Sequence, residues 1–303
     1  MLFISDLHIK EKEIYRNASF KFLNWLLENY KNEILIIGGD LFDDDSPHNK
    51  TRREIAEYLL QFREVHILTG NHDIKRKNGE TSKGNALFPL MKYENIHVYL
   101  DSKEISLENQ KCLFLPFKKI GIEEYNNISW EGDFCFAHFT PIQEQFDNEG
   151  IDTLGIKAKK IFGHIHTAKE HENGNLIIPG VPVITRHLEQ NNPILEIKDG
   201  IVTKIEVPKF FDICDIEYGE EINPDYLYNI KNAPSYEALY KMYPAINIRE
   251  EGFTLVQKDD EGANIDFKFK EDSLKDYFVN FCREKELSRT IASTGIKYME
   301  KYS

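Results

Sequence analysis

The chain has 303 residues, of which 41% are hydrophobic and 29% charged, and its formal net charge is −13. This composition is that of a globular protein with room for one large domain and a smaller one. The chain holds no apolar run of the roughly 18–20 residues that a membrane span requires. Its start lacks the basic region and cleavage site of an export signal, so we expect a cytoplasmic protein without membrane contact. The acidic balance argues against a free-standing DNA-binding protein, which normally carries a basic face.

The four cysteines predict reduced thiols rather than a disulfide framework. Cys112, Cys135, Cys214 and Cys282 are far apart in the sequence and form no CxxC pair. Two of them, Cys112 and Cys135, lie in apolar, strand-like runs. This is typical of buried thiols in cytoplasmic proteins.

The first part of the chain alternates predicted strands and helices. Short apolar runs at residues 2–4, 34–37 and 65–68 predict buried strands. Between them, apolar residues recur at helical spacing over residues 20–30 and 55–62. Strands that alternate with helices in this way indicate an α/β fold with parallel pairing.

The next part of the chain has more closely spaced strands. A turn at Asp199-Gly200 separates apolar runs at residues 194–197 and 201–207, which predicts a hairpin. We expect this part to form a second, more antiparallel sheet, so that the fold is a two-sheet β-sandwich flanked by helices. Further apolar runs precede it, at residues 112–115, 134–137, 161–162 and 176–178.

Near Pro208 the pattern changes to strand-like pieces mixed with helical ones. We expect a boundary here, with a first domain over residues 1–208 and a smaller α+β cap or partner-binding domain over residues 209–303. The charged stretch at residues 272–302 predicts one or two terminal helices.

Five polar clusters carry the chemistry, and each directly follows one of the apolar runs. Loops at the carboxyl ends of strands in an α/β sheet converge on one crevice, so these clusters can meet in space. They offer oxygen and imidazole ligands and no thiolate, a set that suits Mn²⁺, Fe²⁺ or Zn²⁺. The clusters are Asp6-Leu7-His8, Gly39-Asp40-Leu41-Phe42-Asp43, Gly70-Asn71-His72-Asp73, the lone His138 and Gly163-His164-Ile165-His166.

Taken singly, each cluster also has an ordinary structural explanation. Asp6-Leu7-His8 could be a strand-end turn, Gly39-Asp40 a helix-capping turn and Asn71-His72 a tight loop. The alternation in His164-Ile165-His166 places both imidazoles on one face of an extended segment, although such pairs also occur on ordinary surfaces. Five clusters in order, each at a strand end, favour one shared metal site.

In this order the motifs D-x-H, G-D-x-x-D, G-N-H-D, H and G-H-x-H resemble those of the calcineurin-like metallophosphoesterases, over about residues 1–170. In this family two divalent metals activate a water molecule for attack on phosphorus and stabilise the phosphoryl oxygens. The expected metal is Mn²⁺, with Mg²⁺, Fe²⁺ and Zn²⁺ as alternatives. The resemblance implies one metal held by Asp6, His8 and His166, a second held by Asn71, His138 and His164, and Asp40 as the bridge between them.

The same resemblance implies that His72 is the general acid and Asp73 its orienting partner. An alkoxide leaving group needs a proton, and a positioned histidine can supply it near neutral pH. The alternative for His72 is a structural role in ordering its loop.

Further segments resemble the SbcD-type DNA double-strand-break repair nucleases, including phage versions. Leu115-Pro116-Phe117 and Ile178-Pro179-Gly180-Val181-Pro182 are similar to stretches of that family, although Val181 replaces a small polar residue. The resemblance implies DNA as substrate, an SbcC-type coiled-coil ATPase as partner and a homodimer. We expect the helix near residues 52–62 at the dimer surface, or simply in the core. The terminal helices could bind the ATPase or pack within the cap.

A basic loop follows the third cluster in this otherwise acidic chain. Lys75, Arg76, Lys77 and Lys83 could contact DNA phosphates, or could form only a solvated loop. The leading hypothesis is thus a metal-dependent DNA phosphodiesterase, the nuclease subunit of an SbcCD-like complex that acts in repair, recombination or replication. The alternatives are a phosphoesterase for a nucleotide, lipid headgroup or phosphoprotein, which the acidic charge favours, and a scaffold that has lost its metals.

Overall fold

The computed structural model describes residues 1–74, 84–118, 121–144, 150–186, 189–244, 247–255, 257–258 and 264–265. Contacts divide the chain into two compact units. The first consists of Met1–Cys214 with Ile222–Leu227, and the second of Asp215–Glu221 with the described residues from Tyr228 on. The division into domains at residue 208 stays a prediction.

The first sheet has the strand order β12-β11-β1-β2-β3-β4. Strands β1 to β4 run parallel, and β11 pairs antiparallel with the free edge of β1. The hairpin β11–β12 therefore extends this sheet, and its expected place in the second sheet was wrong. The strands are β1 (Leu2–Ile4), β2 (Ile34–Ile37), β3 (Glu64–Leu68), β4 (Ile96–Tyr99), β11 (Ile194–Lys198) and β12 (Ile201–Ile205).

The second sheet has the order β5-β6-β7-β8-β10-β9. Its central strands β6, β7, β8 and β10 are parallel, and the edge strands β5 and β9 are antiparallel to their neighbours. It is thus more parallel than the sequence predicted. The strands are β5 (Lys103–Leu107), β6 (Gln110–Leu115), β7 (Trp130–His138), β8 (Ile156–Gly163), β9 (Lys169–His171) and β10 (Leu176–Ile178).

Apolar side chains between the sheets hold the sandwich together. Phe3 of β1 stacks on Phe136 of β7 with ring centroids 5.6 Å apart, and Phe114 of β6 lies 5.2 Å from Phe136. All three rings are fully buried, and burying such a side chain contributes about 1.5–3 kcal/mol. The predicted two-sheet α/β sandwich is confirmed.

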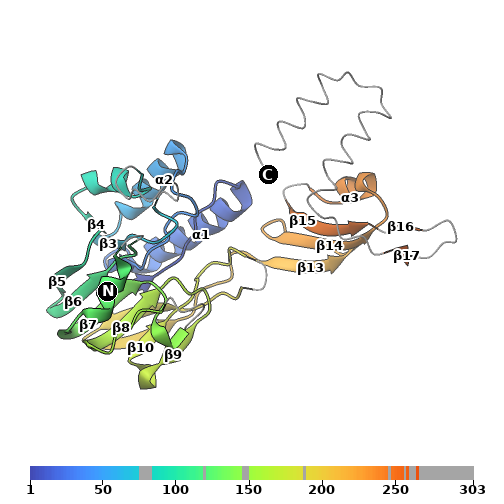
Figure 1. Cartoon of the computed structure of the whole chain (residues 1–303). Coiled ribbons are helices and arrows are strands. Elements are labelled where there is room, and N and C mark those ends of the chain that lie inside the picture. The colour runs from blue at the N-terminus through green and yellow to red at the C-terminus, as the bar shows by residue number, and fades with distance from the viewer. Residues whose placement is uncertain are drawn as a thin grey trace, which may run out of the picture. The chain divides into compact units, whose positions relative to one another are not determined.

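Helices α1 (Glu13–Tyr30) and α2 (Asn49–Leu59) lie together against the first sheet (Figure 1). The apolar stripe of α2, which includes Ile55 and Leu59, is buried in this core. A dimer formed through α2 would therefore use its polar face. Short 3₁₀ helices occur at η1 (Phe88–Lys92), η2 (Ile122–Asn127), η3 (Ile142–Glu144) and η4 (Glu172–Gly174).

The second unit contains strands and one described helix. Helix α3 (Tyr236–Met242) begins after Ser235, whose hydroxyl accepts the N–H of Ala238 at 3.1 Å and caps the first turn. The predicted terminal helices at residues 272–302 lie outside the described residues. Most residues of the remaining strands belong to this unit, although β13 and β14 begin in the first one. These strands are β13 (Ile213–Glu217), β14 (Leu227–Ala233), β15 (Ile248–Leu255), β16 (Gln257–Lys258) and β17 (Asn264–Ile265).

Candidate metal centre

All the predicted ligands lie at the carboxyl ends of parallel strands. Asp6 and His8 follow β1, Asp40 follows β2 and Asn71 follows β3 in the first sheet. The second sheet adds the last residue of β7 and the loop after β8, which are the sources of His138, His164 and His166. The residues predicted as ligands therefore come together from the strand ends of both sheets.

Four of the predicted ligands have a left-handed backbone conformation. Asp6, His8, Asp40 and His164 have φ values of 56°, 41°, 49° and 79°, in the left-handed region. Such a conformation costs of order 1–3 kcal/mol at a non-glycine residue and occurs preferentially at functional sites. Part of the cost is offset locally, because the N–H of His164 donates to the Asp6 carboxylate at 3.0 Å.

The motif glycines permit a close approach of neighbouring segments. A Cβ at Gly39, where φ is +100°, would lie 2.2 Å from Nδ1 of His138. A Cβ at Gly70 would lie 2.1 Å from Oδ1 of Asp40. A side chain at either position would displace a predicted ligand.

The first group of donors consists of Asp6, His8 and His166. The Nε2 atoms of the two histidines lie 3.1 Å apart, and each is within 4 Å of Oδ1 of Asp6. Asp6 and His8 are buried. This spacing is that of ligands on one ion, since imidazoles bind zinc at 2.0–2.1 Å.

The second group contains Asn71, His138 and His164. Oδ1 of Asn71 lies 3.1 Å from Nε2 of His138 and 2.9 Å from Nδ1 of His164. Oδ2 of Asp40 lies between the groups, 3.4 Å from Nε2 of His138 and 3.5 Å from Nε2 of His8. The structure thus brings all seven predicted ligands together, and their assignment to two metal ions stays a prediction.

The tautomers of the imidazoles test whether metals fit this donor set. Nδ1 of His138 lies 2.6 Å from the carbonyl oxygen of Gly38, which can only accept, so Nδ1 carries the hydrogen. Nε2 then faces the oxygens of Asn71 and Asp40. A metal ion bound in place of a proton on Nε2 would have one nitrogen and two oxygen ligands here, so the donor set fits a metal ion.

The close packing of carboxylates and imidazoles shifts the pKa values of several predicted ligands. Burial disfavours the charge of Asp40, but the close His138 and His8 outweigh it and lower the pKa of Asp40 well below the usual carboxyl range. Burial lowers the pKa of His138, yet the Asp40 carboxylate reverses the effect and raises this pKa to about 9. Burial and the neighbouring His138 lower the pKa of His164 to about 4.

Two carboxylates to which the sequence assigned no role contact the predicted ligands. Oε1 of Glu189 is hydrogen-bonded to Nδ1 of His166 at 2.5 Å. Oδ1 of Asp43 lies 3.3 Å from Nδ1 of His8, but without the geometry of a hydrogen bond. A hydrogen-bonded partner such as Glu189 fixes the tautomer and ring orientation of a metal-binding histidine. Asp43 could have been found as the last residue of its motif, whereas Glu189 lies 23 residues from its partner and had no signal.

The arrangement of His72 and Asp73 differs from the expected pairing. Nδ1 of His72 lies 2.9 Å from the backbone carbonyl oxygen of Asp43. The Asp73 carboxylate accepts the N–H groups of Phe42 at 3.2 Å and Gly70 at 2.9 Å, which holds the two motif loops together. Burial and the charge of Asp40 raise the pKa of Asp73 to about 7. Asp73 thus shapes the loops, and the Asp43 carbonyl orients His72.

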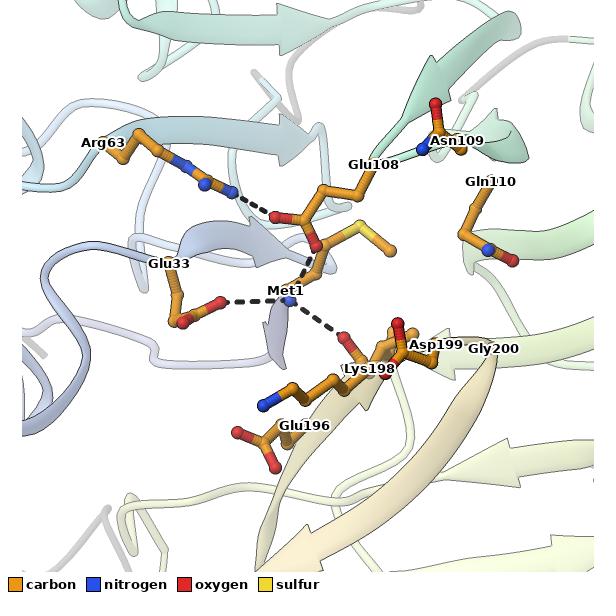
Figure 2. A pocket seen from close by; sticks show the side chains of 11 residues that line it. Met1, Glu33, Arg63, Glu108, Asn109, Gln110, Glu196, Lys198, Asp199 and Gly200 are labelled. Carbon is orange, nitrogen blue, oxygen red and sulfur yellow. Dashed lines mark hydrogen bonds and ion pairs between the residues drawn. The ribbon is translucent and has the colours of Figure 1, made fainter.

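The predicted DNA-binding residues Lys75, Arg76, Lys77 and Lys83 lie outside the described residues. A pocket of about 500 Å³ lies elsewhere, near the amino ends of β1 and β3. There the Met1 amine contacts Glu33 and Glu108, and Arg63 also contacts Glu108 (Figure 2). This pocket contains none of the predicted metal ligands.

A two-sheet sandwich with this donor set at its strand ends defines a metal-dependent hydrolase. The family model for calcineurin-like phosphoesterases matches residues 1–168. The chain belongs to this family. Among the described residues, none of the helices has the length and apolar character of a membrane span.

Individual proteins resemble this chain only in part or at low identity. The DNA double-strand break repair protein Mre11 of Methanocaldococcus jannaschii is 30% identical over 114 residues, which cover 36% of this chain and 29% of that protein. The match thus spans less than a third of the relative's length. A protein of unknown function from Aquifex aeolicus is 20% identical, with a TM-score of 0.29 over 52% of this chain and 87% of that one. A novel archaeal phosphodiesterase is 14% identical, with a TM-score of 0.37 over 67% and 97%.

Proposed function

We propose that the chain is a phosphodiesterase that cleaves DNA with two divalent metal ions. The position of Asp40 Oδ2 between the two donor groups carries the proposal, because one carboxylate can then serve two ions. Asp6, His8 and His166 would hold one ion, and Asn71, His138 and His164 the other. Mn²⁺ is the metal proposed, since oxygen and imidazole ligands suit it. When bound, the metals would supply an activated water and stabilise the phosphoryl oxygens.

The chain's own residues would position the substrate and move the proton. The Asp43 carbonyl holds Nδ1 of His72, so that Nε2 is the atom that would protonate the leaving oxygen. Glu189 would keep Nε2 of His166 directed at the first ion, and the Asp43 carboxylate lies beside Nδ1 of His8. Lys75, Arg76, Lys77 and Lys83 would contact phosphates of the DNA.

The similarity to the DNA repair protein Mre11 supports DNA as the substrate. We propose a cytoplasmic nuclease subunit, host- or phage-encoded, that forms a homodimer and works with an SbcC-type coiled-coil ATPase. The ATPase would supply much of the DNA affinity that a chain of net charge −13 lacks. Residues 209–303 would form the cap that binds this partner. The same acidic charge favours the second candidate, a phosphodiesterase for a small non-DNA substrate.

The test is hydrolysis with added Mn²⁺ of linear duplex DNA, single-stranded DNA and bis-p-nitrophenyl phosphate. We expect DNA cleavage that disappears with EDTA and in Asp40→Ala, and that persists in Asp101→Asn, a change of an exposed aspartate outside the site. Turnover of the small diester with DNA left intact, even beside an SbcC-type partner, would retain the hydrolase and reject the nuclease.

A further inference from the structure

A second cluster of donor atoms lies on strands β3 and β4, apart from the metal centre. Glu64, His66 and His97 each offer one ligand atom, and the three atoms lie within 4.8 Å of one another. The parallel register pairs His66 with His97 across the two strands. Glu64 lies two residues before His66, so its side chain is on the same face of the sheet.

The carboxylate of Glu64 lies between the two imidazoles. Its Oε1 atom is 3.1 Å from Nε2 of His66 and 3.0 Å from Nε2 of His97. Ligands 2.0–2.1 Å from a tetrahedral zinc ion lie about 3.3 Å from one another. The three atoms therefore have nearly the spacing of ligands on one ion.

Nε2 of His66 is the second observation that indicates a cation. The His66 side chain is only 3% exposed, and its Nε2 makes no hydrogen bond of acceptable geometry among the described residues, despite the short distance to Glu64. Its Nδ1 lies 2.7 Å from the Tyr99 hydroxyl. When Nδ1–H donates to that hydroxyl, Nε2 presents a lone pair to the Glu64 carboxylate. A metal ion would satisfy both atoms.

The surroundings of His66 favour a role as a metal ligand over an ion pair with Glu64. Burial lowers the pKa of His66 to about 4, with His97 adding to the effect and Glu64 opposing it. His66 is thus neutral near pH 7, as a metal-binding imidazole must be. Tyr99 corresponds to the hydrogen-bonding partner that metal-binding histidines usually have. Glu64 and His97 are 35% and 42% exposed, which gives an ion access from solvent.

We propose that Glu64, His66 and His97 bind one Zn²⁺ ion that links edge strand β4 to β3. Two imidazoles and a carboxylate form a known zinc ligand set, and a water would complete the tetrahedron. This site would be additional to the metal centre at the strand ends and does not depend on the proposed nuclease activity.

The test counts Zn²⁺ bound to the metal-free full-length chain by equilibrium dialysis, in wild type, His97→Gln and His171→Gln. His171 is the matched control, because it is also a partly exposed histidine paired with a glutamate, Glu144. We expect His97→Gln to bind one equivalent less than wild type, His171→Gln to match wild type, and both to hydrolyse bis-p-nitrophenyl phosphate at the wild-type rate. Glu64→Gln should repeat the loss if His97→Gln folds poorly by circular dichroism.

Tyr99→Phe provides an independent readout. It should keep the stoichiometry at saturation while weakening this one equivalent about 10- to 100-fold, because the hydrogen bond to His66 is lost. Equal Zn²⁺ content in wild type, His97→Gln and Glu64→Gln would overturn the proposal. A loss of the same size in His171→Gln would also overturn it, since the binding would then belong to surface histidines in general.

Discussion

Glu189 and His166 form a carboxylate–imidazole pair whose Oε1 and Nδ1 atoms are 2.5 Å apart. The other oxygen of Glu189 accepts the N–H groups of Thr185 at 2.7 Å and Arg186 at 2.8 Å, so the carboxylate itself is held in place. Hydrogen bonding by His166 and these N–H groups lowers the pKa of Glu189 despite its burial. The pair fixes which nitrogen of His166 faces the metal centre.

Glu189→Gln should therefore weaken metal binding by about 10- to 100-fold, the usual effect of removing such a partner. The measurement is the Mn²⁺ concentration that gives half-maximal hydrolysis of bis-p-nitrophenyl phosphate. Glu144→Gln is the matched control, because Glu144 also contacts a histidine, His171, but belongs to neither ligand group. An unchanged Mn²⁺ requirement in Glu189→Gln would contradict the assigned role.

His72→Gln should slow hydrolysis only when the leaving group needs a proton. For a dinucleotide, whose leaving group is an alkoxide, we expect kcat to fall about 10²- to 10⁴-fold. For bis-p-nitrophenyl phosphate, whose leaving group is stable as an anion, the loss should be small. Metal content should be unchanged, and His48→Gln, at an exposed histidine, should have no effect. Equal losses for both substrates would show that His72 is not the general acid.

Gly70→Ala should disrupt the site and destabilise the fold. The new Cβ would lie 2.1 Å from Oδ1 and 2.2 Å from the backbone nitrogen of Asp40, and the backbone cannot easily move away. We expect a loss of about 1–3 kcal/mol in the free energy of unfolding, measured with urea, together with loss of hydrolysis. Gly219→Ala, at a positive φ but with no atom within 4 Å of the new Cβ, should retain full activity. Full activity in Gly70→Ala would contradict the close packing of these two loops.

The buried thiols should resist alkylation over a wide pH range. Burial raises the pKa of Cys112 from its ordinary value near 9 to about 12, and raises that of Cys135 as well. Because the thiolate is the reactive form, both should react with iodoacetamide far more slowly than half-buried Cys214 up to about pH 10. Because the Cys112 thiol ionises more easily in the unfolded chain, the free energy of unfolding should be unaffected by this group below about pH 9. It should fall as the pH rises towards 12. Peptide mapping by mass spectrometry gives the rates, and fast labelling of Cys112 in the native protein would contradict this.

Most strands and the candidate ligands could be predicted from short stretches of sequence. An apolar run predicts a strand, and the polar residues directly after it lie at that strand's end. The apolar run at residues 34–37 predicts a buried strand, and Asp40 directly after it is placed by that strand's end. Which strands pair with each other cannot be predicted from such short stretches. The strand at residues 194–198 pairs with the free edge of β1, which only the assembled sheet reveals.

Contacts between distant segments explain what the sequence could not reveal. Glu189 reaches His166 from a loop beyond two further strands, and no spacing links them. His66 and His97 become neighbours only through the register of β3 and β4. The sequence shows which side chains can bind a metal, whereas the residues that hydrogen-bond to them depend on tertiary structure.

The left-handed backbone at Asp6, His8, Asp40 and His164 has a consequence for how this protein could change. Glycine adopts that conformation without strain, so replacing His8 by glycine would relieve about 1–3 kcal/mol of backbone strain while deleting a proposed ligand. The backbone strain at these four positions is thus a cost to folding that the proposed metal binding would explain.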